Sequence, residues 1–162
     1  MSSDTFIRTV IAGFFATFTM TIISFLQGGL GLPVIDVGYI LKETFNNVHV
    51  GEPYSIIWGN MAYNVIGVML ALFWVAFLHH RMPGNWAVKG ILYGILISFI
   101  AGALVSPLAM LAGGDSVGIF YYDTWIPLRI LAAGLIMHIG YGLSLLLILK
   151  VAGVDGMDKV PG

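Results

Sequence analysis

The chain has 162 residues, of which 59% are hydrophobic and 9% are charged, whereas a soluble domain typically carries about a quarter charged residues. This composition excludes a water-soluble fold, and the long apolar runs indicate that the solvent is lipid. A net charge of −1 provides no basic surface for nucleic acid, and the lack of cysteine excludes disulfides, thiolate zinc sites and iron–sulfur clusters.

Four apolar segments are long enough to cross a hydrocarbon core of about 30 Å, which takes roughly 20 helical residues. They span residues 9–31, 55–78, 86–111 and 126–149. We therefore expect an all-α, polytopic four-helix bundle that forms one membrane domain over residues 1–162. The first segment is too long for the apolar region of a cleaved signal peptide, so we expect it to be retained.

The connections between these segments differ in length. Residues 36–45 place apolar side chains at helical spacing, which favours a short amphipathic helix in the interface, with an ordered loop as the alternative. Residues 79–85 form a tight turn that predicts antiparallel neighbours on either side of it. Residues 113–125 contain glycines, aromatic residues and acidic residues typical of the headgroup region.

Lys and Arg residues beside the apolar segments predict that both termini are cytoplasmic, because cytoplasmic flanks are enriched in these residues. The side with the termini carries Arg8, Arg81, Lys89, Lys150 and Lys159. The opposite side has Lys42 and Arg129 together with Asp36, Glu43, Glu52, Asp115 and Asp123.

Small residues recur at helical spacing and predict where the helices touch, because membrane helices approach each other closely only where side chains are small. The third segment carries such a stripe along its whole length, and the others carry shorter ones. The members are Gly90, Gly94, Ser98, Gly102 and Ser106; Gly13, Thr17, Thr21, Ser24 and Gly28; Gly67 and Ala71; and Gly134 and Gly142. Pro107 predicts a static bend near the end of the third segment.

His138 is the strongest candidate for a functional residue, because an ionisable group in the middle of a spanning helix is usually partnered or functional. A polar cluster of Asn60, Tyr63, Asn64, Thr17 and Thr21 is predicted near its depth. One interpretation is a neutral histidine whose hydrogen bond fixes helix register. The other is axial ligation of haem or chlorophyll, with Gly134 and Gly142 leaving room for a flat macrocycle on either side.

Other chemistry is disfavoured by what the apolar segments lack. None contains a buried Asp or Glu, which disfavours a proton-coupled or cation-coupled pump. No paired catalytic carboxylates, no nucleophile with a nearby base and no metal-ligand cluster is visible, so we expect neither an enzyme nor a metal site. The adjacent His79 and His80 are interpreted as interfacial anchors.

A family resemblance follows from four stretches that occur in order along the chain. They are residues 11–17 (IAGFFAT), 31–33 (GLP) followed by Asp36, 81–84 with 89–90 (RMPG and KG) and 137–142 (MHIGYG). From Val10 to Val151 the chain resembles an uncharacterised bacterial family of four-helix integral membrane proteins, a domain of unknown function. The resemblance implies that fold in the bacterial cytoplasmic membrane. Family members often have a histidine where this chain has Tyr63 or Asn64, which argues against a histidine pair here.

The function expected from these observations is a non-catalytic accessory subunit that packs against a larger membrane complex, with respiratory or photosynthetic electron transfer as the setting. Its partners would be membrane lipids and other membrane-protein subunits, and no nucleic acid. The alternative is a stand-alone small-molecule carrier, or a membrane protein that binds haem or chlorophyll through the single residue His138.

Overall fold

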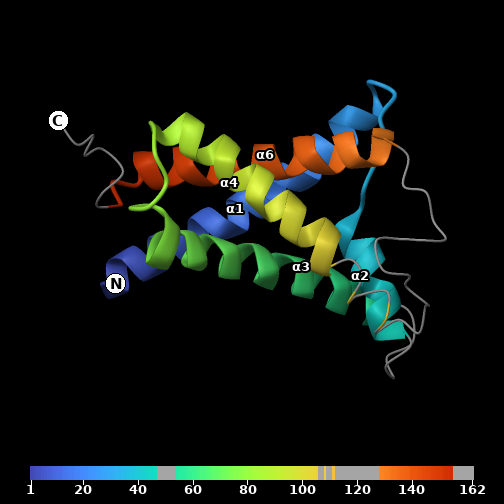
Figure 1. Cartoon of the computed structure of the whole chain (residues 1–162). Helices are drawn as coiled ribbons and strands as arrows, with labels where there is room; N and C mark the ends of the chain where they lie inside the picture. Colours follow the sequence, from blue (N-terminus) through green and yellow to red (C-terminus); the bar gives the residue numbers. More distant parts are fainter. Residues whose placement is uncertain (47–53, 106–107, 109–110, 112–127, 155–162) are drawn as a thin grey trace.

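The computed structural model describes residues 1–46, 54–105, 108, 111 and 128–154. These residues form helices and contain no strand (Figure 1). Four helical stretches, Ser3–Gly28, Tyr54–Leu78, Trp86–Leu104 and Arg129–Val151, are long and apolar enough to cross a membrane. The predicted all-α fold with four helices of spanning length is therefore confirmed. The predicted connection at residues 113–125, Pro107 and His49 lie outside the described residues.

The helix bounds differ from the predicted segments mainly at the first helix. Helix α1 runs over Ser3–Gly28 and begins six residues before the apolar run. Ser2 caps it by accepting a hydrogen bond from the Thr5 amide at 3.1 Å, and Asp4 forms an ion pair with Arg8 at 2.8 Å. A capped polar first turn extends the helix beyond the residues that apolarity alone can locate.

The remaining elements follow the predicted order. Helix α2 spans Val37–Asn46, so the predicted short helix is confirmed. Helix α3 (Tyr54–Phe73) continues into the π-helical turn η1 (Trp74–Leu78), and helix α4 (Trp86–Ile100) continues into the π-helical turn η2 (Ala101–Val105). Helix α6 spans Leu128–Val151.

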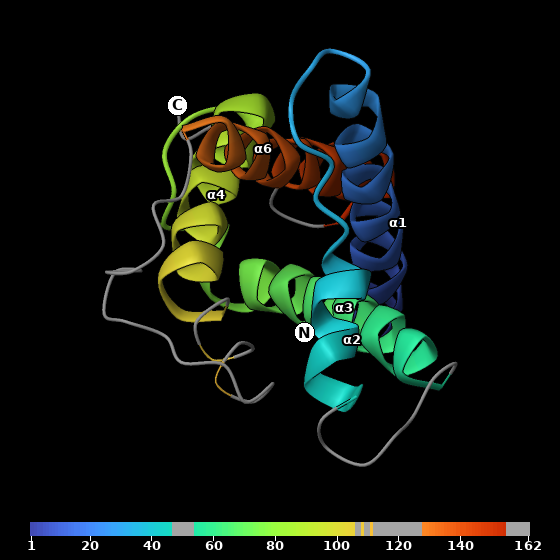
Figure 2. The ribbon, with the colours of Figure 1, turned by 90° about the vertical axis from the view of Figure 1, so that its right-hand side faces the viewer.

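The tight turn predicts that α3 and α4 are neighbours, but the extensive helix contacts lie elsewhere. Helix α3 packs against α2 and along α1, α1 packs along α6, and α6 packs along α4. Helices α3 and α4 meet near their connecting turn, where the rings of Trp74 and Tyr93 lie 4.8 Å apart, and then diverge (Figure 2). The prediction that they are neighbours holds only at that end, because within the described residues α3 has its more extensive contacts with α2 and α1, and α4 with α6.

Glycines make the close helix contacts possible. At the crossing of α4 and α6, a Cβ atom at Gly94 would lie 2.6 Å from the backbone oxygen of His138, and one at Gly142 would collide with the backbone oxygen of Gly90. At the crossing of α1 and α3, a Cβ atom at Gly13 would lie 2.8 Å from that of Ala71. The small-residue stripes therefore mark true crossings, but in α4 the crossing covers the first half of the helix, not its whole length.

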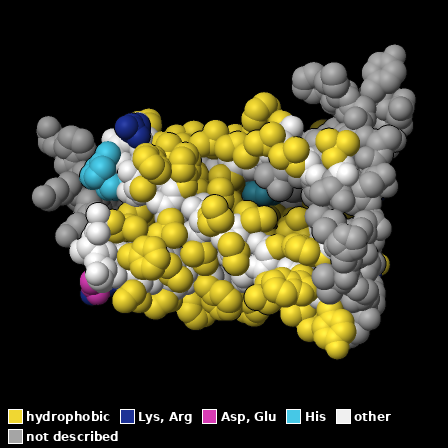
Figure 3. All heavy atoms as spheres, turned by 90° about the horizontal axis from the view of Figure 1, so that it is seen from below, with side chains coloured by type: hydrophobic (Ala, Val, Ile, Leu, Met, Phe, Trp, Pro, Cys, Tyr) yellow, Lys and Arg dark blue, Asp and Glu magenta, His cyan; other side chains and the backbone are white. Residues whose placement is uncertain are grey.

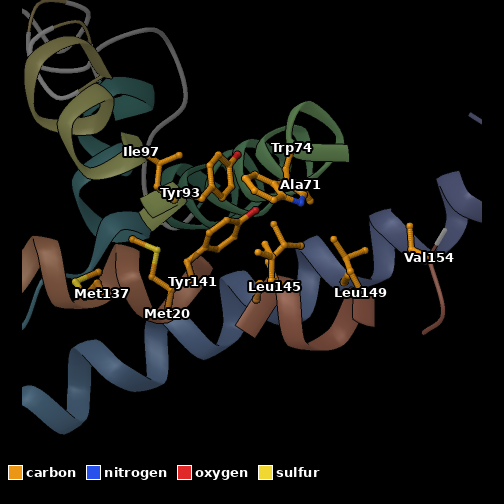
Figure 4. Close-up of a cluster of buried hydrophobic side chains, with 13 residues drawn as sticks. Met20, Ala71, Trp74, Tyr93, Ile97, Met137, Tyr141, Leu145, Leu149 and Val154 are labelled. Atoms are coloured by element: carbon orange, nitrogen blue, oxygen red, sulfur yellow. The ribbon is translucent and has the colours of Figure 1, made fainter. Parts of the chain in front are cut away.

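A buried core fills the end of the bundle beside the α3–α4 turn (Figure 4). Trp74, Tyr93, Tyr141, Leu145 and Leu149 are almost completely buried and come from three different helices. The large apolar side chains Phe14, Phe18, Phe25, Phe73 and Phe77 are exposed, as expected for a surface that faces lipid or another subunit. The core is therefore continuous at one end of the molecule.

We predict that Gly142→Ala destabilises the protein by about 1–3 kcal/mol, the usual cost of overpacking a close contact. The matched control is Gly134→Ala in the same helix, where the nearest atom to an added Cβ is a side-chain carbon of Ile35 at 3.9 Å. Thermal unfolding in mild detergent, followed by circular dichroism, measures both variants. Equal midpoints for Gly142→Ala and Gly134→Ala would contradict the tight crossing.

The turn between α3 and α4 should be sensitive to acid. Burial, the nearby positive charge of His80 and, more weakly, that of Lys89 lower the pKa of His79 from 6.5, while its bond to the Val75 oxygen acts against them. Because the folded state disfavours the protonated ring, the free energy of unfolding falls as pH drops below 6.5. We predict a lower thermal midpoint at about pH 5.5 than at about pH 7.5. His79→Asn should remove most of this difference, whereas His80→Asn should reduce it only in part, because burial is the larger cause of the lowered pKa of His79. An unchanged pH dependence in His79→Asn would rule this explanation out.

Candidate functional site

A cavity of about 580 Å³ lies inside the ring of helices, in the part of the bundle where α3 and α4 have diverged. Helices α1, α2, α3, α4 and α6 all contribute to its wall, together with the segment that leads into α2. Its volume is in the range of about 300–1,000 Å³ that is typical of small-molecule sites. Its wall is mostly aliphatic and aromatic, with a few polar groups.

His138 is the polar group at the middle of helix α6 that lines this cavity. Its Nδ1 lies 2.7 Å from the backbone oxygen of Gly134, one turn earlier in the same helix. Among the described residues no hydrogen bond reaches Nε2, and this atom is not one of the completely buried groups without a partner. The second ring nitrogen is therefore available to a molecule in the cavity. Figure 3 shows a histidine side chain at the base of a hollow bordered by hydrophobic side chains.

Part of the predicted polar cluster assembles beside the cavity. The Tyr63 hydroxyl donates a hydrogen bond to the backbone oxygen of Thr17 at 3.3 Å, and the Thr21 hydroxyl lies 3.5 Å from the Tyr63 oxygen. Thr17 and Tyr63 line the cavity wall together with His138. These residues join α1 to α3 at one side of the site.

Asn60 and Asn64 lie elsewhere. Each donates a side-chain hydrogen bond to a backbone oxygen of its own helix, Asn60 to Ile56 at 3.0 Å and Asn64 to Asn60 at 2.9 Å. Both border a shallow outer hollow together with Phe14. They therefore border the outer hollow and not the cavity that Tyr63 and His138 line.

The macrocycle interpretation expects open space on both sides of His138, but the structure has it on one side only. The space beside Gly90, Gly94 and Gly142 is filled by the crossing of α4 and α6. Gly134, by contrast, lines the cavity, as do Ser98 and Gly102 of α4. Open space beside His138 therefore exists toward Gly134 and not toward Gly142.

Two tyrosines that sequence reasoning did not select, Tyr141 in the cavity wall and Tyr93 beside it in α4, connect helices near the cavity. The Tyr141 hydroxyl donates to the backbone oxygen of Gly67 at 2.5 Å, and the Tyr93 hydroxyl donates to that of Leu70 at 2.6 Å. Both bonds end on α3, so they connect α6 and α4 to the helix that diverges from them. In the sequence, each tyrosine directly precedes a glycine of the crossing, Gly94 or Gly142, and this position could have indicated that its ring lies at a helix interface.

The segment before α2 closes another part of the cavity wall. The Ser24 hydroxyl donates to the backbone oxygen of Ile35 and accepts from its amide, both at 2.8 Å, and the Gln27 amide donates to the Pro33 oxygen at 3.0 Å. Asp36 then caps α2 by accepting from the Tyr39 amide at 2.9 Å. The small polar residues of α1 therefore anchor this segment, in addition to allowing helix contact.

Cofactor and metal chemistry can be judged from the side chains present. No group of three or more His, Asp or Glu side chains that could hold a metal ion occurs within the described part of the chain. Within it, the other histidines, His79 and His80, lie at the α3–α4 turn, outside the cavity. His138 would therefore be the sole histidine ligand that the described cavity wall offers to a macrocycle.

The chain matches no family model, no curated protein and no solved structure. Its resemblance to the bacterial four-helix family consequently stays a prediction, and the function is argued below from the cavity.

Tyr141→Phe should destabilise the bundle by roughly 1 kcal/mol, within the range measured for hydrogen bonds between membrane helices. The change removes the donor to Gly67 and keeps the buried ring. Tyr54→Phe is the control, because Tyr54 is exposed at the start of α3. The thermal midpoint in detergent measures both variants, and a midpoint of Tyr141→Phe equal to that of Tyr54→Phe would show that the bond does not stabilise the fold.

Proposed function

We propose that this protein is a multi-pass membrane protein that binds a lipid-soluble small molecule in the cavity between its helices. The observation that carries the proposal is the cavity itself, a partly open and largely apolar space of about 580 Å³ whose volume suits a small molecule. An apolar wall with one ring nitrogen facing inward is suited to a mostly apolar ligand that has one polar group.

The site proposed here is a binding site, and it requires no catalytic group. Besides the engaged hydroxyls of Tyr63 and Tyr141, the wall contains the Asp36 carboxylate, which caps α2. Two of its groups have no hydrogen-bond partner among the described residues, the Ser98 hydroxyl and Nε2 of His138. A carrier, a receptor or a cofactor-holding protein of the membrane fits this arrangement.

The setting of the proposal is the bacterial cytoplasmic membrane with both termini inside. Arg8, Arg81 and Lys150 support this orientation, because they lie at one end of the bundle, at the start of α1, after the end of α3 and at the end of α6. The proposed orientation thus rests on the same distribution of Lys and Arg that was used in the sequence analysis.

A second candidate is the accessory-subunit role. It is favoured by one observation, the row of exposed aromatic side chains Phe14, Phe18 and Phe25 along α1. Such a row suits contact with lipid equally well, and the accessory role does not explain why the bundle contains a cavity. We therefore place ligand binding first.

The direct test is to identify what accompanies the protein. We predict that the protein purified from its own membranes in mild detergent yields, on organic extraction and mass spectrometry, one apolar compound in near-stoichiometric amount. Gly134→Trp should lose the compound, because an added side chain at this position enters the open cavity. Leu147→Trp in the same helix should retain it, because Leu147 is exposed on the outer surface.

The outcomes separate the candidates. A visible absorption band that disappears in Gly134→Trp would identify the ligand as a pigment or haem. Stoichiometric co-purification of other membrane subunits, with the same extract from all three proteins, would refute ligand binding and favour the accessory role. Circular dichroism of each variant establishes that Gly134→Trp is folded.

A further inference from the structure

The hydrogen bond of His138 determines which kind of ligand group its free nitrogen can bind. The backbone oxygen of Gly134 can only accept a hydrogen bond, and it lies 2.7 Å from Nδ1. Nδ1 therefore carries the hydrogen and donates it. In the neutral ring, Nε2 then has no hydrogen and presents a lone pair to the cavity.

We infer that the ligand is an apolar molecule whose polar group is a hydroxyl, and that this hydroxyl donates a hydrogen bond to Nε2 of His138. The inference rests on the proposed function and specifies the ligand class of the same site. A bare carbonyl, ester or ether has no hydrogen to donate, so it would face the lone pair without a bond.

A hydroxyl is also the group that the rest of the wall accommodates. The Ser98 side chain of α4 lines the same cavity, one turn beyond Gly94, which contacts the backbone oxygen of His138. No hydrogen bond joins the Ser98 hydroxyl to another described group. A ligand hydroxyl that donates to His138 keeps its own lone pairs and can accept from a serine.

The position of the cavity indicates that the ligand comes from the hydrocarbon and not from water. Within the described residues, the ring of close helix contacts runs from α3 through α1 and α6 to α4, and it is interrupted between α3 and α4 (Figure 2). Ile66 and Leu70 of α3, Ile100 of α4 and Ala101 of η2 line the cavity and are partly exposed. This side of the wall is apolar, so a molecule dissolved in lipid can pass it without losing water of hydration.

The π-helical turn η2 lies at this interruption, with Ala101 and Gly102 in the cavity wall. A π-helical turn is an uncommon deformation of an α-helix that occurs frequently at functional sites. It widens α4 where the cavity borders the gap, which agrees with an entry route at this place.

The test compares two probes that differ in one hydrogen-bond donor, 4-hexylphenol and its methyl ether 4-hexylanisole. Histidine labelled with nitrogen-15 in both ring positions is introduced into the full chain in detergent, and His138→Phe identifies the signals of His138. We expect 4-hexylphenol to shift the unprotonated nitrogen signal of His138 saturably. The ether should compete for the site without causing that shift. The phenol should bind about three- to tenfold more tightly than the ether, as expected for one neutral hydrogen bond.

Two variants separate this inference from the function on which it rests. His138→Phe should bind both probes equally, and Gly134→Trp should bind neither. Equal affinity of the two probes in the original protein, lost in Gly134→Trp, would confirm the binding site and overturn the hydroxyl ligand. The hydroxyl ligand would also be overturned by a signal that shows the hydrogen on Nε2, or by no saturable binding of either probe. The extraction experiment decides on the proposed function independently.

Discussion

The structure depends on close contacts between helices at glycine. In a hydrocarbon solvent the hydrophobic effect does not drive helices together, so their association relies on van der Waals contact and on hydrogen bonds. Gly94 and Gly142 allow this contact between α4 and α6, and Gly13 allows it between α1 and α3. Among the described residues, no comparable glycine contact joins α3 to α4. Tyr93 therefore joins them near the turn, where it donates to Leu70, and the helices diverge beyond it. The cavity therefore forms between α3 and α4, the two helices that glycine contacts do not bring together.

The same contacts determine how His138 is presented. Because Gly94 meets the backbone at His138, helix α4 covers one side of this residue, and the ring is directed to the open side. Gly134 supplies the oxygen that holds the ring and has no side chain that would occupy the space beside it. A functional residue, its orienting partner and the room for a ligand thus arise from a few positions of α6. The aromatic side chains on the outer surface are separate from this arrangement.

The sequence predicts the parts of this fold that depend on local pattern. The four spanning lengths, the short helix after residue 36 and the crossing glycines Gly90, Gly94 and Gly142 follow from apolarity and spacing. The cavity does not, because it depends on the angle between α3 and α4 and not on either helix alone. Asn64 was assigned to the His138 cluster on depth along the helix, yet depth does not specify direction, and Asn64 faces the outer hollow. Tyr141 was missed because a buried tyrosine is unremarkable until its hydroxyl is seen to donate to Gly67 on another helix.

The central claim is that the bundle is hollow beside His138 and that a small molecule fills the hollow. An electron cryomicroscopy structure of the protein in lipid nanodiscs, with a bound antibody fragment to add mass, tests it most directly. The account predicts that α3 and α4 stand apart beyond Tyr93 and that non-protein density in the space between the helices touches Nε2 of His138. It would be contradicted by a structure in which α3 lies along the whole of α4 and side chains fill the space.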